Sequence, residues 1–576
     1  MLKLLAFLKP YLGLVLLVVV FLFGQALAEL FLPTLMSDVV NNGMVRGDSA
    51  YIWRYGTYMA GAALVSTVCS IVSAYLASMV AVGLGRDVRA RVFSRVEAYS
   101  LREFDRFGTA SLITRTTNDV TQVQTLLVMA MRFMVYAPIM CAGGLMLAYG
   151  KNHALTWVLA LVLPVMLAVI ATLATLIVPL FRTMQSKLDT VNRVLRENLV
   201  GIRVIRAFDR QDAESERFRL ANRELTDISI RVNQIMAAIQ PVMMLMLNVT
   251  SIAIIWLGGK YIAQNFLTLG DMMAFIQYAM QIMFSIIMVT LMFVMMPRAQ
   301  ASAVRINEVL ELVPGIVDPA VSRSPAGVKG RVELRNVTFR YPGAEEPAIR
   351  NVSFTTFPGE LTAIIGGTGS GKSTLISLIP RFYDVESGSV TVDGVDVREM
   401  SQPELRARIG FVPQTPVLFS GTIASNIRYG KQDATDDEVA HAGQVAQAEE
   451  FVGQLGQGYD SPVAQGGTNL SGGQKQRLSI ARALVRRPEI YIFDDSFSAL
   501  DFKTDARLRT ALRKETGQAT VIIVAQRVST VMDADRIVVL DEGAVVGIGK
   551  HRELLDSCKV YREIVASQLS EEEMAR

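Results

Sequence analysis

One short run of the chain combines glycines, a lysine and hydroxyl side chains at the spacing of a phosphate-binding loop. It consists of Gly366, Gly367, Thr368, Gly369, Ser370, Gly371, Lys372 and Ser373. The apolar stretch Leu361 to Ile365 precedes it and Thr374 to Leu378 follows, so the glycines fall between a predicted buried strand and a predicted helix. Backbone N–H groups of such a turn bind phosphate oxygens, Lys372 adds a positive charge at the outer phosphates, and the Ser373 hydroxyl can bind Mg2+. We therefore predict a nucleotide site that uses Mg2+.

A carboxylate at the end of another apolar run supports this prediction. Ile490 to Phe493 is followed directly by Asp494. In a phosphate-loop hydrolase, an aspartate at the end of the neighbouring buried strand holds the Mg2+ shell of the nucleotide. Two such motifs at two strand ends are much more specific than one.

A third segment has the composition of a helix start that can bind an anion. Ser471, Gly472, Gly473 and Gln474 precede the helical stretch Leu478 to Val485. Unpaired N–H groups point outward at such a start, so the segment can bind phosphate. An ordinary capped helix has the same composition, and the residues by themselves leave both interpretations open.

The elements around these motifs predict an α/β domain in the second half. Strand-like runs alternate with helical stretches, as a phosphate-loop domain requires. The runs are Val332 to Phe339, Ser389 to Val392, Ile409 to Val412, Ile490 to Phe493, Thr520 to Ala525 and Arg536 to Leu540. Upstream, Pro314 to Gly330 lacks periodicity and is typical of a linker. We predict a linker at 311–330 and a nucleotide-binding domain at 331–576.

The first half is apolar enough to lie in a membrane. Hydrophobic residues make up 51% of the 576 residues and charged residues only 19%, which excludes a wholly soluble protein. A bilayer-spanning helix needs about 20 apolar residues. Six segments reach this length: Tyr11 to Met36, Gly56 to Val82, Arg132 to Tyr149, Leu155 to Leu180, Ile239 to Tyr261 and Met272 to Met296. We predict an all-helical transmembrane domain at 1–310.

Arginine and lysine side chains gather in two long connections, after the second and the fourth predicted spans. The positive-inside rule places these connections and both termini in the cytoplasm. Leu188, Val191 and Leu195 recur at helical spacing, which predicts that the spans continue into the cytoplasm as helices. The turning points are Glu103 to Gly108 and Ala207 to Gln211. They are either solvated turns or contacts that transmit movement from a nucleotide-driven domain, and the sequence supports both.

The N-terminal segment resembles a secretory signal, with Ala26, Leu27 and Ala28 as a cleavage site. The apolar stretch continues past that site through Leu32, and a nucleotide-binding half must stay where ATP is. We therefore favour an uncleaved first span behind a short amphipathic segment.

Few polar side chains interrupt the spans. We favour helix packing for Asn248 and Gln281, and leave Glu29 open between helix packing and a substrate path. The last two spans are rich in methionine, which suits either a cavity for varied apolar ligands or irregular helix packing.

The net charge of +4 suggests no nucleic-acid partner, and three dispersed cysteines suggest neither a disulfide framework nor a zinc site.

With the six-span half, Leu470 to Gln474 resembles the signature of ABC transporters, and the chain resembles a half-transporter of the type IV, multidrug-exporter-like architecture. The resemblance implies that two nucleotide-binding domains pair head to tail, with each ATP between the phosphate loop of one and the signature of the other. It also implies that the two cytoplasmic turning points are coupling helices that dock on nucleotide-binding domains. The implied ATP-binding residues are Tyr341 against adenine, Gly366 to Thr374, Ser471, Gly472, Gly473, Gln474 and Asp501, and the implied Mg2+ shell is Ser373, Gln414 and Asp494.

Two catalytic positions depart from the family pattern. Asp495 stands where the family has a glutamate that polarises the attacking water, and Gln526 stands where it has a histidine. A carboxylate shortened by one methylene lies about 1 Å too far from the water, which can cost on the order of 100-fold in rate. A glutamine cannot carry a proton or a positive charge in place of histidine. Gln414 is the third expected catalytic residue, and Gln465, in place of a usual glutamate, is a softer departure.

An intact signature beside an impaired phosphate-loop site predicts a heterodimer. We expect this chain to bind ATP, hydrolyse it slowly, and lend its signature to a partner half-transporter that has the glutamate and the histidine. The expected function is ATP-driven export of hydrophobic compounds, drug-like or lipid-like, across a bacterial inner membrane. An importer of the same fold and an ATP-gated channel or regulator are the alternatives.

Overall fold

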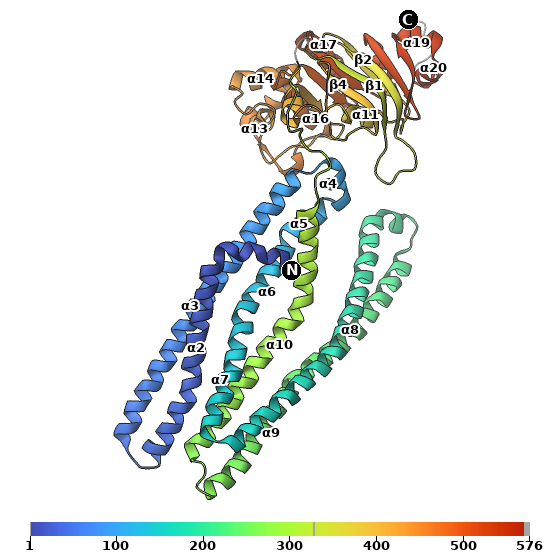
Figure 1. Cartoon of the computed structure of the whole chain (residues 1–576). Coiled ribbons are helices and arrows are strands. Elements are labelled where there is room, and N and C mark those ends of the chain that lie inside the picture. Colours follow the sequence, from blue (N-terminus) through green and yellow to red (C-terminus); the bar gives the residue numbers. More distant parts are fainter. Residues whose placement is uncertain (1, 326–328, 569–576) are drawn as a thin grey trace. The chain divides into compact units, whose positions relative to one another are not determined.

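The computed structural model describes residues 2–325 and 329–568, and it divides into two compact units. The first comprises Met1–Glu97 and Thr109–Leu312, and the second comprises Ala98–Gly108 and Val313–Arg576. The expected fold class, an all-α membrane domain followed by an α/β nucleotide-binding domain, is confirmed (Figure 1).

The described residues of the first unit form helices joined by short turns. The helices are α1 (Leu2–Leu5), η1 (Ala6–Tyr11), α2 (Leu12–Asp38), η2 (Val39–Met44), α3 (Ser49–Glu97), α5 (Thr109–Thr116), α6 (Asn118–Met129), η3 (Ala130–Met134), α7 (Val135–Lys151), α8 (His153–Ala207), α9 (Gln211–Ala263) and α10 (Leu269–Glu311).

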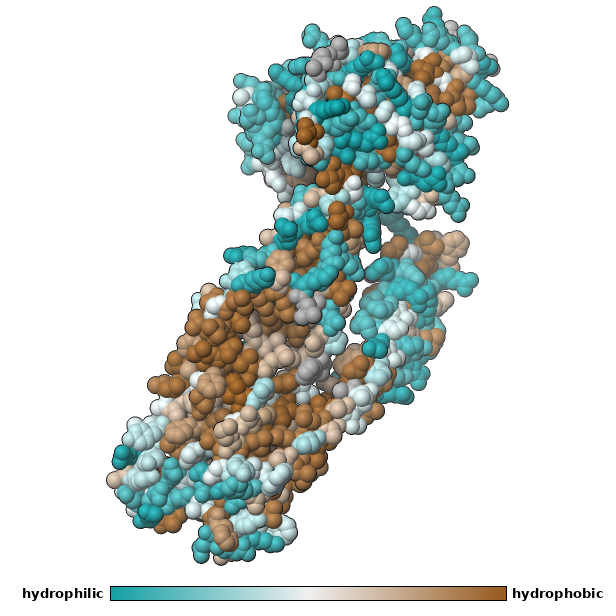
Figure 2. Space-filling model, in the orientation of Figure 1, coloured by the Kyte–Doolittle hydropathy of each residue, from teal (hydrophilic) through white to brown (hydrophobic). Residues whose placement is uncertain are grey.

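Six helical segments of this unit are long and apolar enough to cross a membrane. Hydrophobic surface covers the middle of these helices (Figure 2). The three longest helices, α3, α8 and α9, have 49, 55 and 53 residues, far more than the roughly 20 that a bilayer requires. The prediction that the spans continue as helices is thereby confirmed, and α8 and α9 run side by side along their length (Figure 1).

Charged side chains tie the helices together near the ends of the spans. Lys151 Nζ lies 2.6 Å from Asp271 Oδ1, and Ser37 Oγ donates to the same oxygen at 2.7 Å. Toward the other end, Asp119 accepts a hydrogen bond from Arg305 Nε at 2.8 Å. These contacts join α2, α7 and α10 at one end and α6 with α10 at the other.

Two large sheets form the scaffold of the second unit. A four-stranded sheet has the order β2-β1-β4-β5, and a six-stranded sheet has the order β12-β11-β3-β10-β9-β6. The strands are β1 (Val332–Phe339), β2 (Ile349–Thr356), β3 (Leu361–Gly366), β4 (Ser387–Val392), β5 (Val395–Asp396), β6 (Ile409–Val412), β7 (Gly421–Thr422), β8 (Pro462–Val463), β9 (Ile490–Asp494), β10 (Thr520–Val524), β11 (Arg536–Asp541) and β12 (Ala544–Gly549).

Short helices surround these sheets. They are α4 (Leu101–Phe107), α11 (Lys372–Ser377), α12 (Gln402–Ala407), α13 (Ile423–Arg428), α14 (Asp436–Val445), α15 (Glu449–Val452), η4 (Gly458–Asp460), η5 (Gln465–Gly467), α16 (Gly472–Val485), α17 (Phe502–Glu515), α18 (Val528–Val531), α19 (His551–Ser557) and α20 (Lys559–Ala566).

The central strands are buried on both faces, because successive side chains point to opposite sides of a strand. Ile364 and Ile492 belong to the core shared with β1, β2 and β4, whereas Ile365, Tyr491 and Phe493 belong to the core on the helical side. Because β3, β9, β10 and β6 are parallel neighbours, their carboxyl ends lie along one edge of the sheet. That edge positions the candidate site.

The predicted domain boundaries, 1–310, 311–330 and 331–576, stay a prediction. The two compact units divide the chain between Leu312 and Val313 without a separate linker, and Ala98–Gly108, which includes α4, groups with the second unit. Residues 326–328 of the predicted linker and the tail 569–576 lie outside the described residues.

Candidate functional site

The predicted phosphate loop lies between β3 and α11. Gly369 and Gly371 have φ angles of +83° and +92°, a region in which a side chain would be strained. Gly366 has no room for a side chain either, because a Cβ there would lie 2.2 Å from the Leu540 carbonyl oxygen. The glycines are therefore required by the path of the loop.

Lys372 is buried under this loop. Its Nζ donates to the carbonyl oxygens of Gly366 and Gly367, at 2.9 and 2.7 Å. Burial lowers the pKa of Lys372, and Asp495 and Asp494 oppose that shift. The ammonium group is thus held at the loop by weak carbonyl acceptors, which negatively charged phosphate oxygens can replace.

Ser373, in the first turn of α11, meets Asp494 at the end of β9. Ser373 Oγ donates to Asp494 Oδ1 at 2.9 Å. Burial raises the pKa of Asp494, while the hydrogen bond from Ser373 lowers it. A hydroxyl and a buried carboxylate beside a phosphate loop are the oxygen ligands that Mg2+ prefers, so the donor set fits this ion.

Three predicted catalytic residues come together at the same edge. Asp495 Oδ2 accepts hydrogen bonds from Gln526 Nε2 at 3.2 Å and from Gln414 Nε2 at 3.4 Å. Gln414 lies two residues after β6 and Gln526 two residues after β10, so the strand order β10-β9-β6 sets them on either side of Asp495. The backbone N–H of Asp495 donates to the Val524 carbonyl at 3.0 Å.

Burial raises the pKa of the Asp495 carboxyl, and hydrogen bonds from Ser498 and Gln414 oppose that shift. Its φ angle is +44°, in the left-handed region that is uncommon for residues other than glycine. Asp495, Gln414 and Gln526 form a cluster, the Asp495 cluster, in which the two amides can orient the Asp495 carboxylate. Neither amide can accept or release a proton at neutral pH.

Tyr341 lies beside the first turn of α11. Its Oη and Thr374 Oγ1 are 3.0 Å apart, and its ring meets the edge of Phe339, with centroids 5.0 Å apart. The side chain is 38% exposed, so part of its ring is available to a ligand.

The signature segment, Ser471 to Gln474, forms a capped helix start that is separate from the phosphate loop. Ser471 caps α16, with Oγ accepting from Gln474 N at 3.3 Å, and Gln474 Oε1 accepts from Ser471 N at 2.8 Å. Asp501 likewise caps α17 by accepting from Thr504 N at 3.0 Å. Within residues 2–325 and 329–568, no hydrogen bond joins Ser471–Gln474 to the phosphate loop. One chain therefore brings together the phosphate loop, Tyr341, Gln414, Asp494, Asp495 and Gln526, but not the signature.

Sequence reasoning missed Gln568. Its Nε2 donates to the Gln526 carbonyl and its Oε1 accepts from Val528 N, both at 2.8 Å. Tyr561 and Val565 are fully buried and anchor helix α20, which ends two residues before Gln568. The amphipathic spacing of that helix could have located a buried face, but not the contact with Gln526.

The predicted turning point near Glu103 forms helix α4. Ser100 and Glu103 cap it, with Ser100 N donating to Glu103 Oε2 at 2.9 Å. Tyr383 Oη donates to Asp105 Oδ2 at 3.5 Å, which joins α4 to the nucleotide-binding domain. A cavity of about 360 Å3 lies between α4 and the nucleotide-binding domain, and its lining includes Ser100 and Arg102 at the start of α4 and Tyr341.

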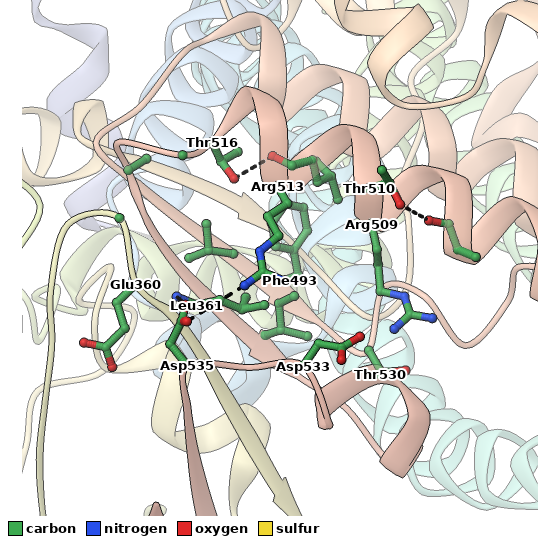
Figure 3. A pocket seen from close by; sticks show the side chains of 17 residues that line it. Glu360, Leu361, Phe493, Arg509, Thr510, Arg513, Thr516, Thr530, Asp533 and Asp535 are labelled. Carbon is green, nitrogen blue, oxygen red and sulfur yellow. Dashed lines mark hydrogen bonds and ion pairs between the residues drawn. The ribbon is translucent and has the colours of Figure 1, made fainter. Parts of the chain in front are cut away.

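A second cavity, of about 270 Å3, lies at the opposite ends of the strands (Figure 3). Leu361, which begins β3, lines it, whereas the phosphate loop follows the other end of that strand. Arg513 and Asp535 face each other across it at 3.9 Å. No predicted site residue lines this cavity.

Known proteins match nearly the whole chain. The family model of the ABC transporter transmembrane region matches residues 15–286, and that of the ABC transporter matches residues 349–498. An uncharacterised ABC transporter ATP-binding protein of Mycobacterium tuberculosis is 44% identical over 564 residues, 97% of each chain. An ATP-dependent lipid A-core flippase of Syntrophus aciditrophicus is 31% identical over 511 residues, 89% of this chain and 85% of that protein. A solved bacterial Atm1-family ABC exporter with ATP bound matches with a TM-score of 0.81 and 25% identity, covering 98% of this chain and 99% of that one.

Proposed function

The chain belongs to the ABC transporter family, as an exporter half-transporter with an ATPase domain, and from this premise we propose that it is the slowly hydrolysing subunit of a heterodimeric exporter. The observation that carries the proposal is the Asp495 cluster. Its carboxylate accepts from the amides of Gln414 and Gln526, and neither of these can act as an acid or a base.

The site residues keep the roles expected from the sequence. Tyr341 packs against adenine, and Lys372 with the loop N–H groups binds the phosphates. Ser373, Gln414 and Asp494 would hold Mg2+, which would neutralise charge on the phosphates. Asp495 orients the attacking water from a position one methylene too short for efficient proton abstraction.

Ser471, Gly472, Gly473 and Gln474 serve the partner. Among the described residues no hydrogen bond joins them to the phosphate loop of the same chain, which supports an ATP site shared between two chains. With an intact signature and a slow phosphate-loop side, this chain fits a partner half-transporter that supplies a glutamate and a histidine.

Helix α8 also supports a protein partner. Beyond the predicted span it carries large apolar side chains among its arginines, in a stretch that water would otherwise cover. These side chains are Leu199, Val200 and Val204, which are 67%, 83% and 61% exposed. A second half-transporter packed along α8 would bury them.

The substrate is a small hydrophobic compound, drug-like or lipid-like, taken from the cytoplasm or the inner leaflet. The likeness to a lipid A-core flippase and the methionines of α9 and α10 support this class. We place the protein in the bacterial inner membrane, surrounded by lipid, with both termini and the nucleotide-binding domain in the cytoplasm.

The mechanism couples closure of the nucleotide-binding domains to the spans. ATP binding closes the two domains, and α4 passes the movement to α3 and α5, between which it lies in the chain. Hydrolysis at the partner's site then resets the pair.

The test is to tag this chain in its native membrane, purify it, and identify the bound chain by mass spectrometry. We expect a second half-transporter with glutamate and histidine at the positions of Asp495 and Gln526. Inverted vesicles with this pair should accumulate hydrophobic dyes only with ATP. Recovery of a homodimer with rapid ATP turnover would contradict the proposal. Loss of dye would indicate an importer, and equilibration without accumulation would indicate a channel.

A further inference from the structure

Glu29 is an acidic residue deep inside a membrane-spanning helix. It lies nine residues before Asp38 at the end of α2, or about 14 Å along the helix axis. Gln281 donates to the Glu29 backbone carbonyl at 3.1 Å and lies ten residues after Asp271, or about 15 Å along α10. The hydrocarbon layer of a bilayer is about 30 Å thick. With the Lys151–Asp271 pair at one boundary of this layer, Glu29 lies near its middle.

Uncharged donors from three helices converge on the Glu29 carboxylate. Gln25 Nε2 and Ser66 Oγ both donate to Oε1 at 3.0 Å, and Tyr136 Oη donates to Oε2. These residues belong to α2, α3 and α7. In a region without bulk water, such donors solvate a carboxylate in the place of water.

The Glu29 carboxylate has no counter-charge in the described part of the chain. No Lys, Arg or His nitrogen of these residues lies within 4.0 Å of it, whereas the acidic side chains Asp271 and Asp119 both have basic partners. Gln281 adds an unused acceptor, since its buried Oε1 has no hydrogen-bond partner. A charged side chain at this depth is costly and normally pairs with another charge. The site thus offers negative charge and acceptors but lacks a cation.

Apolar side chains surround these polar groups. Leu30 and Met140 are fully buried in the core next to Glu29, and Met283 lies two residues from Gln281 in a cluster with Met166 and Met243. Unbranched thioether side chains adapt to ligands of different shape. A cation bound at Glu29 would therefore lie against apolar side chains.

We propose that Glu29 recognises the positive charge of the substrate, and that the exported compounds include hydrophobic cations such as protonated amines. The N–H groups of such a cation pair with the Glu29 carboxylate and the Gln281 amide oxygen, and its apolar body lies against the methionines. The inference rests on the proposed export of hydrophobic compounds and specifies their charge.

Two dyes with the same ring system separate charge from hydrophobicity, because Nile blue is cationic and Nile red is neutral. The transporter is purified with its native partner, reconstituted in lipid, and assayed for dye-stimulated ATPase activity and for ATP-dependent dye uptake in inverted vesicles. We expect Glu29→Gln to raise the half-maximal concentration of Nile blue at least tenfold and to change that of Nile red less than twofold. Ser66→Ala, which removes a donor but keeps the charge, should preserve the preference for Nile blue.

Glu29→Asp keeps the charge and decides the question if the glutamine variant does not assemble. This variant should raise the half-maximal concentration of Nile blue but not that of Nile red, and Nile blue should remain the better substrate. The inference is overturned if either Glu29 variant raises the half-maximal concentrations of both dyes equally, or if Glu29→Gln leaves that of Nile blue unchanged. The proposed exporter function would still stand in either case. If the wild-type pair moves neither dye with ATP, the inference and the proposed export of hydrophobic compounds both fall.

Discussion

The side-chain amide of Gln526 donates a hydrogen bond to the Asp495 carboxylate, with 3.2 Å between Nε2 and Oδ2. Gln414 donates to the same oxygen at 3.4 Å. The residue that should polarise the attacking water is therefore engaged by two amides, which hold its orientation without exchanging protons.

Restoring the two altered positions should accelerate this site. Asp495→Glu combined with Gln526→His is expected to raise single-turnover ATP hydrolysis about 10- to 100-fold, because the longer carboxylate reaches the water and the imidazole can carry a proton. The measurement uses a pair whose other phosphate loop is disabled by a lysine-to-alanine change. Asp495→Asn is the control and should leave the slow rate nearly unchanged. A tenfold fall in that control would mean that Asp495 already acts as an efficient base.

Removing the Asp494 charge should stabilise the nucleotide-free protein. Burial raises the pKa of Asp494 in the folded state, so its ionised form destabilises the fold at neutral pH and costs nothing in acid, where both states are protonated. Asp494→Asn without Mg2+ and nucleotide should unfold a few degrees higher than wild type at pH 7.5, on the order of 1 kcal/mol. The gain should shrink as the pH falls toward 4. Differential scanning calorimetry measures both, and a lower unfolding temperature at pH 7.5 would refute this account.

The ring of Tyr341, rather than its hydroxyl, should carry nucleotide affinity. Tyr341→Ala removes the aromatic face and is expected to raise the ATP dissociation constant about tenfold. Tyr341→Phe loses only the contact with Thr374 and should stay within about threefold. Titration with a fluorescent ATP analogue at this chain's site compares the two. Equal effects would show that the hydroxyl contact matters more than the ring.

Gln568 should hold the backbone of the segment that carries Gln526. Gln568→Ala removes the bonds to the Gln526 carbonyl and to Val528 N. Amide exchange at Val528 is expected to speed up at least tenfold, because local opening then exposes this N–H.

Gln568→Glu is the matched control, since its carboxylate still accepts from Val528 N but cannot donate to Gln526. It should keep the Val528 amide protected. Hydrogen exchange with mass spectrometry on the peptide around Val528 distinguishes the variants, and equal exchange in wild type and Gln568→Ala would remove the proposed role.

The sequence by itself determined the class of the chain and named most residues of the candidate site. Spans are set by uninterrupted apolar length, and the phosphate loop, Asp494 and the signature by residue types at short spacing. The sequence-based prediction missed strands that combine buried and exposed residues, such as β2 (Ile349–Thr356) and β12 (Ala544–Gly549). A strand at a sheet edge or half exposed to solvent lacks a continuous apolar run. Only the tertiary structure brought Gln414 and Gln526 to one oxygen of Asp495, clamped Gln568 on the Gln526 backbone, and gathered donors from three helices around Glu29. Those contacts join residues far apart in the chain, and they depend on strand order and helix packing, which local periodicity does not encode.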